Sequence, residues 1–116
     1  MLCADVFCTS ETFSAHCASD QVVIVRRALY GRLEAGRCIT SEYEHAMGCF
    51  ADVTVHLQDV CSGRQNCTVL VATIDAVAQP CGKDFKSYLD VTHQCVTGAP
   101  DNNNLLVINC SVKLME

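Results

Sequence analysis

Ten cysteines and four histidines are the side chains of this 116-residue sequence with the most reactive chemistry open to them. Structural zinc sites most often use cysteines paired at C-x2-C spacing, and no such pair occurs here. The histidines are scattered, without an H-x-x-x-H pair. We therefore expect no metal ion and no other cofactor. We interpret the histidines as surface or hydrogen-bonded residues, namely His16, His45, His56 and His93.

Catalysis is the second chemistry to consider, and the sequence argues against it. A thiolate nucleophile must be a free cysteine with a low pKa, whereas an even set of cysteines at this density is typical of a secreted disulfide scaffold. Glycoside hydrolysis would need two carboxylates across a cleft, and no Asp/Glu pair stands out from the surface charges. We predict a protein that is not an enzyme, either secreted or the extracellular portion of a membrane protein.

Charge and hydropathy exclude further classes of partner. Eight basic and thirteen acidic residues give a net charge of −5, which disfavours nucleic acid. No apolar run approaches the length of about 18 residues needed for membrane insertion. Met1-Leu2 lacks the features of a signal peptide, so we expect Met1 to begin a mature domain. Two N-x-[ST] patterns, at Asn66 and Asn109, fit secretion.

The elements that must position any site can be predicted from hydrophobic patterning. The chain has the length of one domain, so we expect a single domain over residues 1–116. Strands are predicted at residues 21–25, 68–71, 88–92 and 105–112. A helix is predicted at residues 52–61, with Asp52 as its N-cap, although alternating apolar residues leave a strand open there.

Turns and loops separate these elements. Tyr30-Gly31-Arg32 indicates a turn or bend, and Gln79-Pro80-Cys81-Gly82 a second turn. Residues 61–67 form a polar loop with a cysteine at each end, which a local disulfide would close. Residues 96–104 read as a loop before the last strand. The predicted fold class is α+β: a small disulfide-rich domain with antiparallel sheets, one main helix and long structured loops.

Four motifs in a fixed order resemble a known family. They are YGR at residues 30–32, C-x-G-x-x-x-C at 61–67, PC at 80–81, and YL-x-V-x-x-x-C at 88–95. Eight cysteines within residues 8–95 follow the same order as the motifs. The chain therefore resembles the sea-urchin-egg-lectin (SUEL) or rhamnose-binding lectin family. The domain of this family also occurs in latrophilin-type receptors. Residues 96–116 would be a C-terminal extension with an extra strand.

The resemblance implies a disulfide pattern, namely Cys8–Cys38, Cys17–Cys95, Cys49–Cys81 and Cys61–Cys67. Cys3 and Cys110 remain outside this frame, and we predict that they pair and join the two termini. The chain-entropy model assigns about 4–5 kcal/mol to so long a loop. The alternative is that one or both form a covalent link to a partner chain.

The resemblance also implies a sugar site. In the family it comprises a glutamate after the first framework cysteine, the YGR tyrosine, an aspartate before PC and a lysine before YL. This sequence has Thr9, Tyr30, Gln79 and Ser87 at those positions. We expect sugar contacts from Tyr30 and Gln79 and from nearby charged residues, Glu11, Lys83 and Lys86. Gly31, Arg32 and Tyr88 are expected to be structural motif residues.

Two functions remain open at this point. One is a calcium-independent lectin domain that binds L-rhamnose or D-galactose type glycans on cell surfaces; the run at residues 101–104 lacks the spaced ligands of an EF-hand. The other is an adhesion or receptor-ectodomain module on the same scaffold that binds a cell-surface protein, its sugar site lost. A third, weaker interpretation is an accessory domain from a larger secreted enzyme. Whichever function holds, an alternative interpretation of the single residues stays open: Tyr30 and Arg32 as scaffold, and Glu11, Lys83 and Lys86 as solvated surface charges. A single weak site would need a homo-oligomer or tandem domains for avidity.

Overall fold

The computed structural model describes residues 3–34, 36–39, 48–82, 85–97 and 106–109. These residues form seven strands, one α-helix and one 3-10 helix, which confirms the α+β prediction. In chain order the elements are β1 (Cys3–Cys8), β2 (Thr12–His16), β3 (Gln21–Arg32), β4 (Cys49–Asp52), α1 (Thr54–Cys61), β5 (Asn66–Leu70), η2 (Val71–Ala76), β6 (Tyr88–Thr97) and β7 (Leu106–Asn109).

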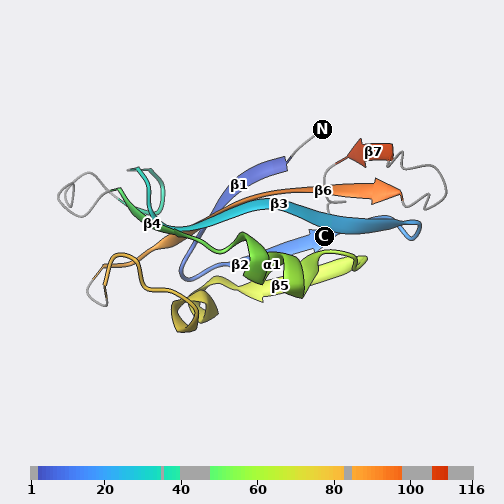
Figure 1. The fold of residues 1–116 in the computed structure, drawn as a ribbon. Coiled ribbons are helices and arrows are strands. Elements are labelled where there is room, and N and C mark those ends of the chain that lie inside the picture. Colours follow the sequence, from blue (N-terminus) through green and yellow to red (C-terminus); the bar gives the residue numbers. More distant parts are fainter. Residues whose placement is uncertain (1–2, 35, 40–47, 83–84, 98–105, 110–116) are drawn as a thin grey trace.

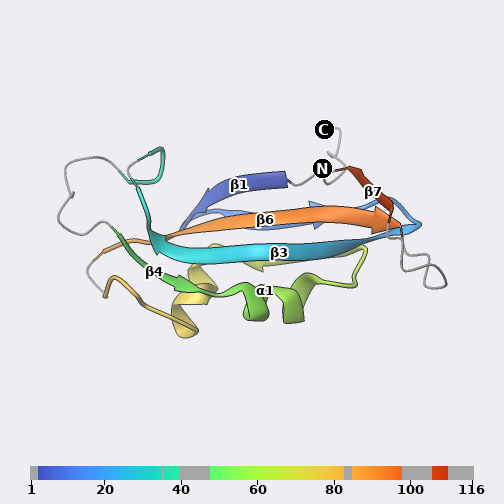
Figure 2. The same ribbon diagram turned by 45° about the horizontal axis from the view of Figure 1, so that its top comes forward.

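Two antiparallel sheets make up the fold. The larger sheet has the strand order β1-β6-β3-β4, and β7 pairs with the C-terminal end of β6. The smaller sheet consists of β2 and β5. Figures 1 and 2 show α1 and η2 on the same side of the larger sheet as the β2–β5 pair. The domain therefore has two layers, with its core between them.

The core is built from side chains that alternate inward along the strands. One buried hydrophobic cluster contains Val23 and Val25 of β3, Phe13 and Ala15 of β2, and Leu57 of α1. The rings of Phe7 and Phe13 meet edge to face, with their centroids 5.3 Å apart. Burying one such apolar side chain contributes about 1.5–3 kcal/mol, so this small interior is a substantial source of stability.

The long central strand corrects one prediction. Tyr30-Gly31-Arg32 is not a turn, because β3 continues from Gln21 through Arg32 and pairs there with β4 and β6. Gly31 is needed for a different reason. A Cβ at this position would lie 2.2 Å from the carbonyl oxygen of Cys49. The glycine permits close approach of β4, which outweighs its general tendency to interrupt strands.

The predicted helix is present but begins later than expected. Asp52 ends β4, and Val53 occupies the N-cap position of α1. The prediction of Asp52 as N-cap was therefore wrong by one residue. Its carboxylate nevertheless accepts a hydrogen bond of 2.9 Å from the backbone N–H of Thr54. Hydrogen bonding from Thr54, by its side-chain hydroxyl first and its backbone N–H second, lowers the pKa of Asp52 from its ordinary value.

Four disulfides cross-link the described residues, and they are the pairs that the family resemblance implies: Cys8–Cys38, Cys17–Cys95, Cys49–Cys81 and Cys61–Cys67. Cys3 is also a half-cystine. Its predicted partner Cys110 lies outside the described residues, so the Cys3–Cys110 pairing stays a prediction.

The loop that Cys61–Cys67 closes is docked on the N-terminal part of β3. The N–H of Val23 donates to the carbonyl of Arg64, and the N–H of Gly63 donates to the carbonyl of Val23. The second predicted turn is also confirmed, since the N–H of Gly82 donates to the carbonyl of Gln79. The last predicted strand is seen as β7. The loop predicted at residues 96–104 was wrong at its start, because residues 96 and 97 belong to β6, and its residues 98–104 lie outside the described residues.

Candidate functional site

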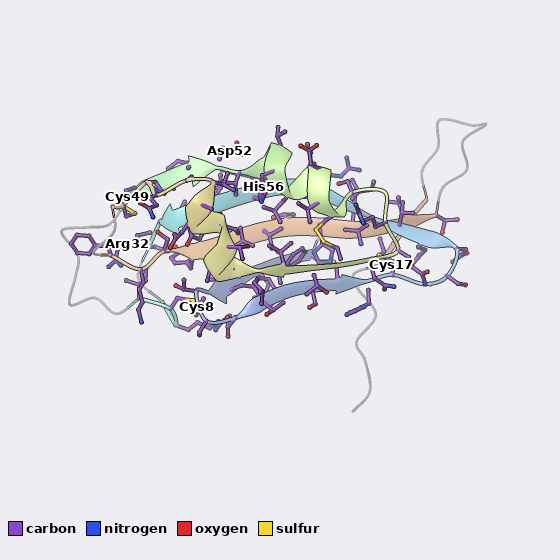
Figure 3. All side chains as sticks on the ribbon, turned by 90° about the horizontal axis from the view of Figure 1, so that it is seen from below. Cys8, Cys17, Arg32, Cys49, Asp52 and His56 are labelled. Carbon is purple, nitrogen blue, oxygen red and sulfur yellow. A yellow bond between two sulfur atoms is a disulfide. The ribbon has the colours of Figure 1, made fainter. Side chains whose placement is uncertain are left out.

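The larger sheet ends beside η2 at one end of the molecule (Figure 1). The β1–β2 turn, the C-terminal end of β3, η2 and the segment before β6 come together there. We call this region the loop end and define it by Thr9, Glu11, Tyr30, Asp75, Gln79, Lys86 and Ser87. Figure 3 shows Cys8, Arg32 and Cys49 at this end of the molecule and Cys17 toward the other. The Cys8–Cys38 and Cys49–Cys81 disulfides therefore brace the loop end.

Tyr30 connects the core to the surface of the loop end. Its side chain is fully buried, and its hydroxyl donates a hydrogen bond of 2.6 Å to Oδ1 of Asp75. Burial raises the pKa of Tyr30 above its usual range, and the neighbouring Asp75 carboxylate raises it further. Tyr30 therefore remains a neutral donor that holds an exposed carboxylate in one orientation.

Asp75 is the exposed member of this pair. It lies on η2, and the structure shows no second hydrogen bond to its carboxylate from the part of the chain that it describes. Sequence reasoning did not single out this residue. The available signal was that Asp75 is the only acidic residue between Cys67 and Cys81.

Glu11 also lies at the loop end, but its carboxylate already forms hydrogen bonds and an ion pair within the domain. Its carboxylate accepts the N–H of Cys8 at 2.7 Å and forms a two-pronged ion pair with Arg37, with distances of 2.7 and 2.9 Å. The hydrogen bond from Arg37, reinforced by the one from Cys8, lowers the pKa of Glu11 to about 2. Arg37 also donates to the carbonyl of Val6. Glu11 thus fixes the segment around Cys38, a role that the sequence did not reveal.

Glu11 and the neighbouring disulfide also resemble a metal site at first sight. A carboxylate oxygen of Glu11 and the sulfurs of Cys8 and Cys38 lie within 4.8 Å of one another. The two sulfurs are bonded to each other, so neither is a thiolate ligand. The cluster is structural.

Thr9 and Ser87 are in contact, although 78 residues separate them in the sequence. The hydroxyl of Thr9 donates a hydrogen bond of 2.8 Å to the backbone carbonyl of Ser87, which is buried. These are two of the positions where the resemblance led us to expect other residues, a glutamate and a lysine. Thr9 and Ser87 are both short and neutral, whereas the family pattern has a glutamate and a lysine at these two positions.

The other predicted sugar contacts are Gln79, Lys86 and Lys83, and the structure describes the first two. The side chains of Gln79 and Lys86 are exposed, one at the turn before Cys81 and the other just before β6. The backbone carbonyl of Lys86 accepts a hydrogen bond of 2.7 Å from Nη1 of Arg32. Lys83 lies outside the described residues.

Arg32 and Tyr88 have the structural positions expected of motif residues. Arg32 is buried, with its guanidinium 5.2 Å from the centroid of the Phe85 ring. Its Nε and Nη2 have no hydrogen-bond partner within the part of the chain that the structure describes. The hydroxyl of Tyr88 accepts the N–H groups of Leu33 and Glu34, at 3.1 and 2.9 Å. Both side chains hold the segment after β3 against the start of β6.

The geometry defines a class of protein: a cross-linked β scaffold that presents polar side chains at one end, as binding modules do. Residues 15–95 match the family described as D-galactoside/L-rhamnose binding SUEL lectin domain. The chain therefore belongs to this lectin family. It is also similar to the L-rhamnose-binding lectin CSL1 of Oncorhynchus keta, with 32% identity over 81 residues.

That alignment covers 66% of this chain and 28% of the relative, so the chain spans less than a third of the curated protein that it matches. Among the described residues, no helix has both the length and the apolar character needed to cross a membrane.

Proposed function

We propose that this domain binds saccharides of the D-galactoside or L-rhamnose type outside the cell, through the loop end and without calcium. The observation that carries the proposal is the Tyr30–Asp75 pair. A fully buried tyrosine holds one oxygen of an exposed carboxylate at 2.6 Å. Family membership supports the same conclusion, because the matching family is described by its binding of these two sugars.

The chemistry of the pair suits a sugar hydroxyl. An ionised carboxylate accepts about four hydrogen bonds, and among the described residues only the hydroxyl of Tyr30 donates one to Asp75. Hydrogen bonds to a charged acceptor are stronger than those between neutral groups. Because Tyr30 fixes the carboxylate before any ligand arrives, binding incurs a smaller ordering cost.

Gln79 and Lys86 complement this acceptor. The carboxamide of Gln79 offers two donor hydrogens and an acceptor oxygen, and the ammonium group of Lys86 offers three donors. Both side chains are exposed at the loop end. Protein groups alone can therefore satisfy sugar hydroxyls, which supports binding without a calcium ion. We propose Lys83, close to both in sequence, as a further contact.

The contact between Thr9 and Ser87 favours a second candidate function. Short neutral residues replace the acid and base of the family pattern there, and Glu11 is already paired with Arg37. A site that loses polar partners loses discrimination between hydroxyl arrangements. The alternative is therefore an adhesion or receptor-ectodomain module that binds a cell-surface protein through the same scaffold.

The decisive experiment combines a glycan array with calorimetry of L-rhamnose and D-galactose, each with and without a calcium chelator. We expect saccharide binding that the chelator leaves unchanged. Asp75→Ala is expected to weaken it at least about tenfold, the effect of losing one charged hydrogen bond. Asp59→Ala is the matched control, because Asp59 is an exposed aspartate on α1. No signal across the array from folded protein would reject the lectin proposal in favour of the protein-binding one.

Avidity is part of the proposal. A shallow site with few contacts binds one sugar weakly, and several linked sites raise the effective affinity without new contacts. The relative from Oncorhynchus keta is long enough for this domain to account for only 28% of it. We propose that this domain acts either in tandem with further domains or as a homo-oligomer.

A further inference from the structure

The tripeptide Asn66-Cys67-Thr68 matches the acceptor pattern for N-linked glycans, and the structure shows how its three side chains are arranged. They begin β5, where successive side chains point to opposite faces. Asn66 and Thr68 are exposed, whereas Cys67 is only 5% exposed and bonds to Cys61. The disulfide at the middle position therefore lies on the face away from Asn66 and does not obstruct it.

The amide of Asn66 is oriented by its cross-strand neighbour. His16 of β2 pairs directly with Asn66, and its Nδ1 lies 3.1 Å from Oδ1 of Asn66. A carboxamide oxygen only accepts hydrogen bonds, so His16 donates through Nδ1. No described residue accepts a hydrogen bond from Nδ2 of Asn66. Among the described residues, the nitrogen that would carry a glycan therefore has no partner, and the hydrogen bond is made by the oxygen, which glycosylation leaves unchanged.

We propose that Asn66 carries an N-linked glycan. The donor is an oligosaccharide joined through a diphosphate to a membrane lipid. Nδ2 of Asn66 forms a bond to C1 of the first sugar, and the bond between C1 and the diphosphate oxygen breaks. The lipid diphosphate leaves with the bonding electron pair, and Nδ2 loses one proton to a base of the transferase. Transfer takes place on the extended chain, so the folded domain has only to accommodate the product.

The position of Asn66 determines what such a glycan would cover. Asn66, Thr68 and Leu70 share the outer face of β5, and Leu70 is 59% exposed. A glycan at Asn66 would extend over this two-stranded sheet and shield that apolar side chain and the sheet edge. β5 runs from Asn66 toward η2 (Figure 1), and the four residue steps to Leu70 span about 13 Å. The loop end with Asp75 lies beyond Leu70, so the glycan would be attached outside it.

This inference rests on the extracellular location proposed above but not on saccharide binding. The test is secretion of the full chain, behind a signal peptide, from animal cells, followed by peptide mass mapping before and after treatment with an N-glycanase. We expect a glycan on the peptide with Asn66, which is lost in Asn66→Gln and Thr68→Ala and kept in Thr68→Ser. The matched control Asn109→Gln alters the second acceptor pattern and leaves the Asn66 glycan in place.

Folded, secreted protein with an unmodified Asn66 peptide would overturn the inference. The site requires no saccharide ligand, so a silent glycan array would leave this result unchanged. A second measurement tests the placement of the glycan. Treated and untreated protein should show the same response to any ligand of the loop end, and a change of more than about threefold would contradict the geometry described.

Discussion

Tyr30 and Asp75 lie 45 residues apart in the sequence and are joined by a hydrogen bond of 2.6 Å between the tyrosine hydroxyl and Oδ1. The bond connects the centre of the larger sheet to the short helix η2 that follows β5. Through this bond Tyr30, a core residue of the YGR motif, orients the carboxylate of Asp75 at the surface. In the recognition site that we propose, Tyr30 would therefore act by positioning Asp75, because its own ring is fully buried.

Tyr30→Phe tests this positioning role. The ring remains to fill the core, and only the hydroxyl is lost, so we expect a loss of about 0.5–1.5 kcal/mol in the free energy of unfolding. Saccharide affinity should fall by about threefold to tenfold, because Asp75 is then free to rotate. Urea unfolding and calorimetry provide the two measurements. Full affinity in Tyr30→Phe would show that Asp75 needs no support.

The ion pair between Glu11 and Arg37 predicts a pH dependence. The pKa of Glu11 is lowered from its ordinary value of 4.5 to about 2, first by the hydrogen bond from Arg37. A carboxyl with a lowered pKa stabilises the folded state above its ordinary pKa, and this contribution is lost as the pH falls through the folded-state pKa. Wild-type protein should therefore melt above Glu11→Gln at pH 7, and the difference should vanish by about pH 2.

Glu34→Gln serves as the control for this series, because Glu34 is exposed and has no ion pair with a described residue. Its melting temperature should follow that of the wild type at every pH. If Glu11→Gln also follows the wild type, the ion pair with Arg37 contributes nothing to stability.

Much of the local structure could be predicted from the sequence. The disulfide-closed loop at residues 61–67, the helix before it and the start of β6 all follow from patterns within a few residues. β1 and β2 were not predicted. The pairing partner of β1 is β6, and residues such as Cys3 and His93 meet from opposite ends of the chain. The alternation of apolar and polar residues within a strand does not indicate which distant strand it pairs with.

The candidate site shows the same division. The resemblance implied the four disulfide pairs that the structure shows, and it pointed to Tyr30 and Gln79 as site residues, which stays a prediction. The contacts of Asp75 and Arg37 form only in the folded chain. Gly31 was assigned to a turn because glycine interrupts strands in general. Glycine is required there because the backbone of β4 lies too close to leave room for a side chain. The residues next to Gly31 in the sequence do not indicate this contact.

Gly31→Ala provides a test of this close approach. The added Cβ would meet the carbonyl oxygen of Cys49 at 2.2 Å and Cα of Phe50 at 2.5 Å. Backbone atoms of a strand held by the Cys49–Cys81 disulfide cannot move aside easily, so we expect a loss of about 1–3 kcal/mol in the free energy of unfolding. The matched control is Gly36→Ala, where no atom lies within 4 Å of the added Cβ.

Gly36→Ala should change the free energy of unfolding by less than about 0.5 kcal/mol. Equal effects of the two substitutions in chemical denaturation would mean that β3 and β4 are not held as closely as described.

Two buried disulfides allow a comparison of loop length at matched burial. Cys17–Cys95 closes a separation of 78 residues and Cys61–Cys67 one of 6, and each pair has one sulfur residue fully buried and one 5% exposed. The chain-entropy model predicts losses of about 4.5 and about 2 kcal/mol for the two double alanine variants. Reversible urea unfolding measures both. A larger loss for the short loop would show that its docking on Val23 outweighs chain entropy.

The most direct test of the account is to map where a saccharide binds. We propose two-dimensional amide NMR of the isotope-labelled, disulfide-intact chain during titration with L-rhamnose and with D-galactose. Saccharide-dependent shifts should concentrate at Glu11, Asp75, Gln79 and Lys86, while amides near His16 and Asn66 stay unchanged. Shifts confined to another surface, or none at millimolar concentrations of either sugar, would contradict the assignment of the loop end as the recognition site.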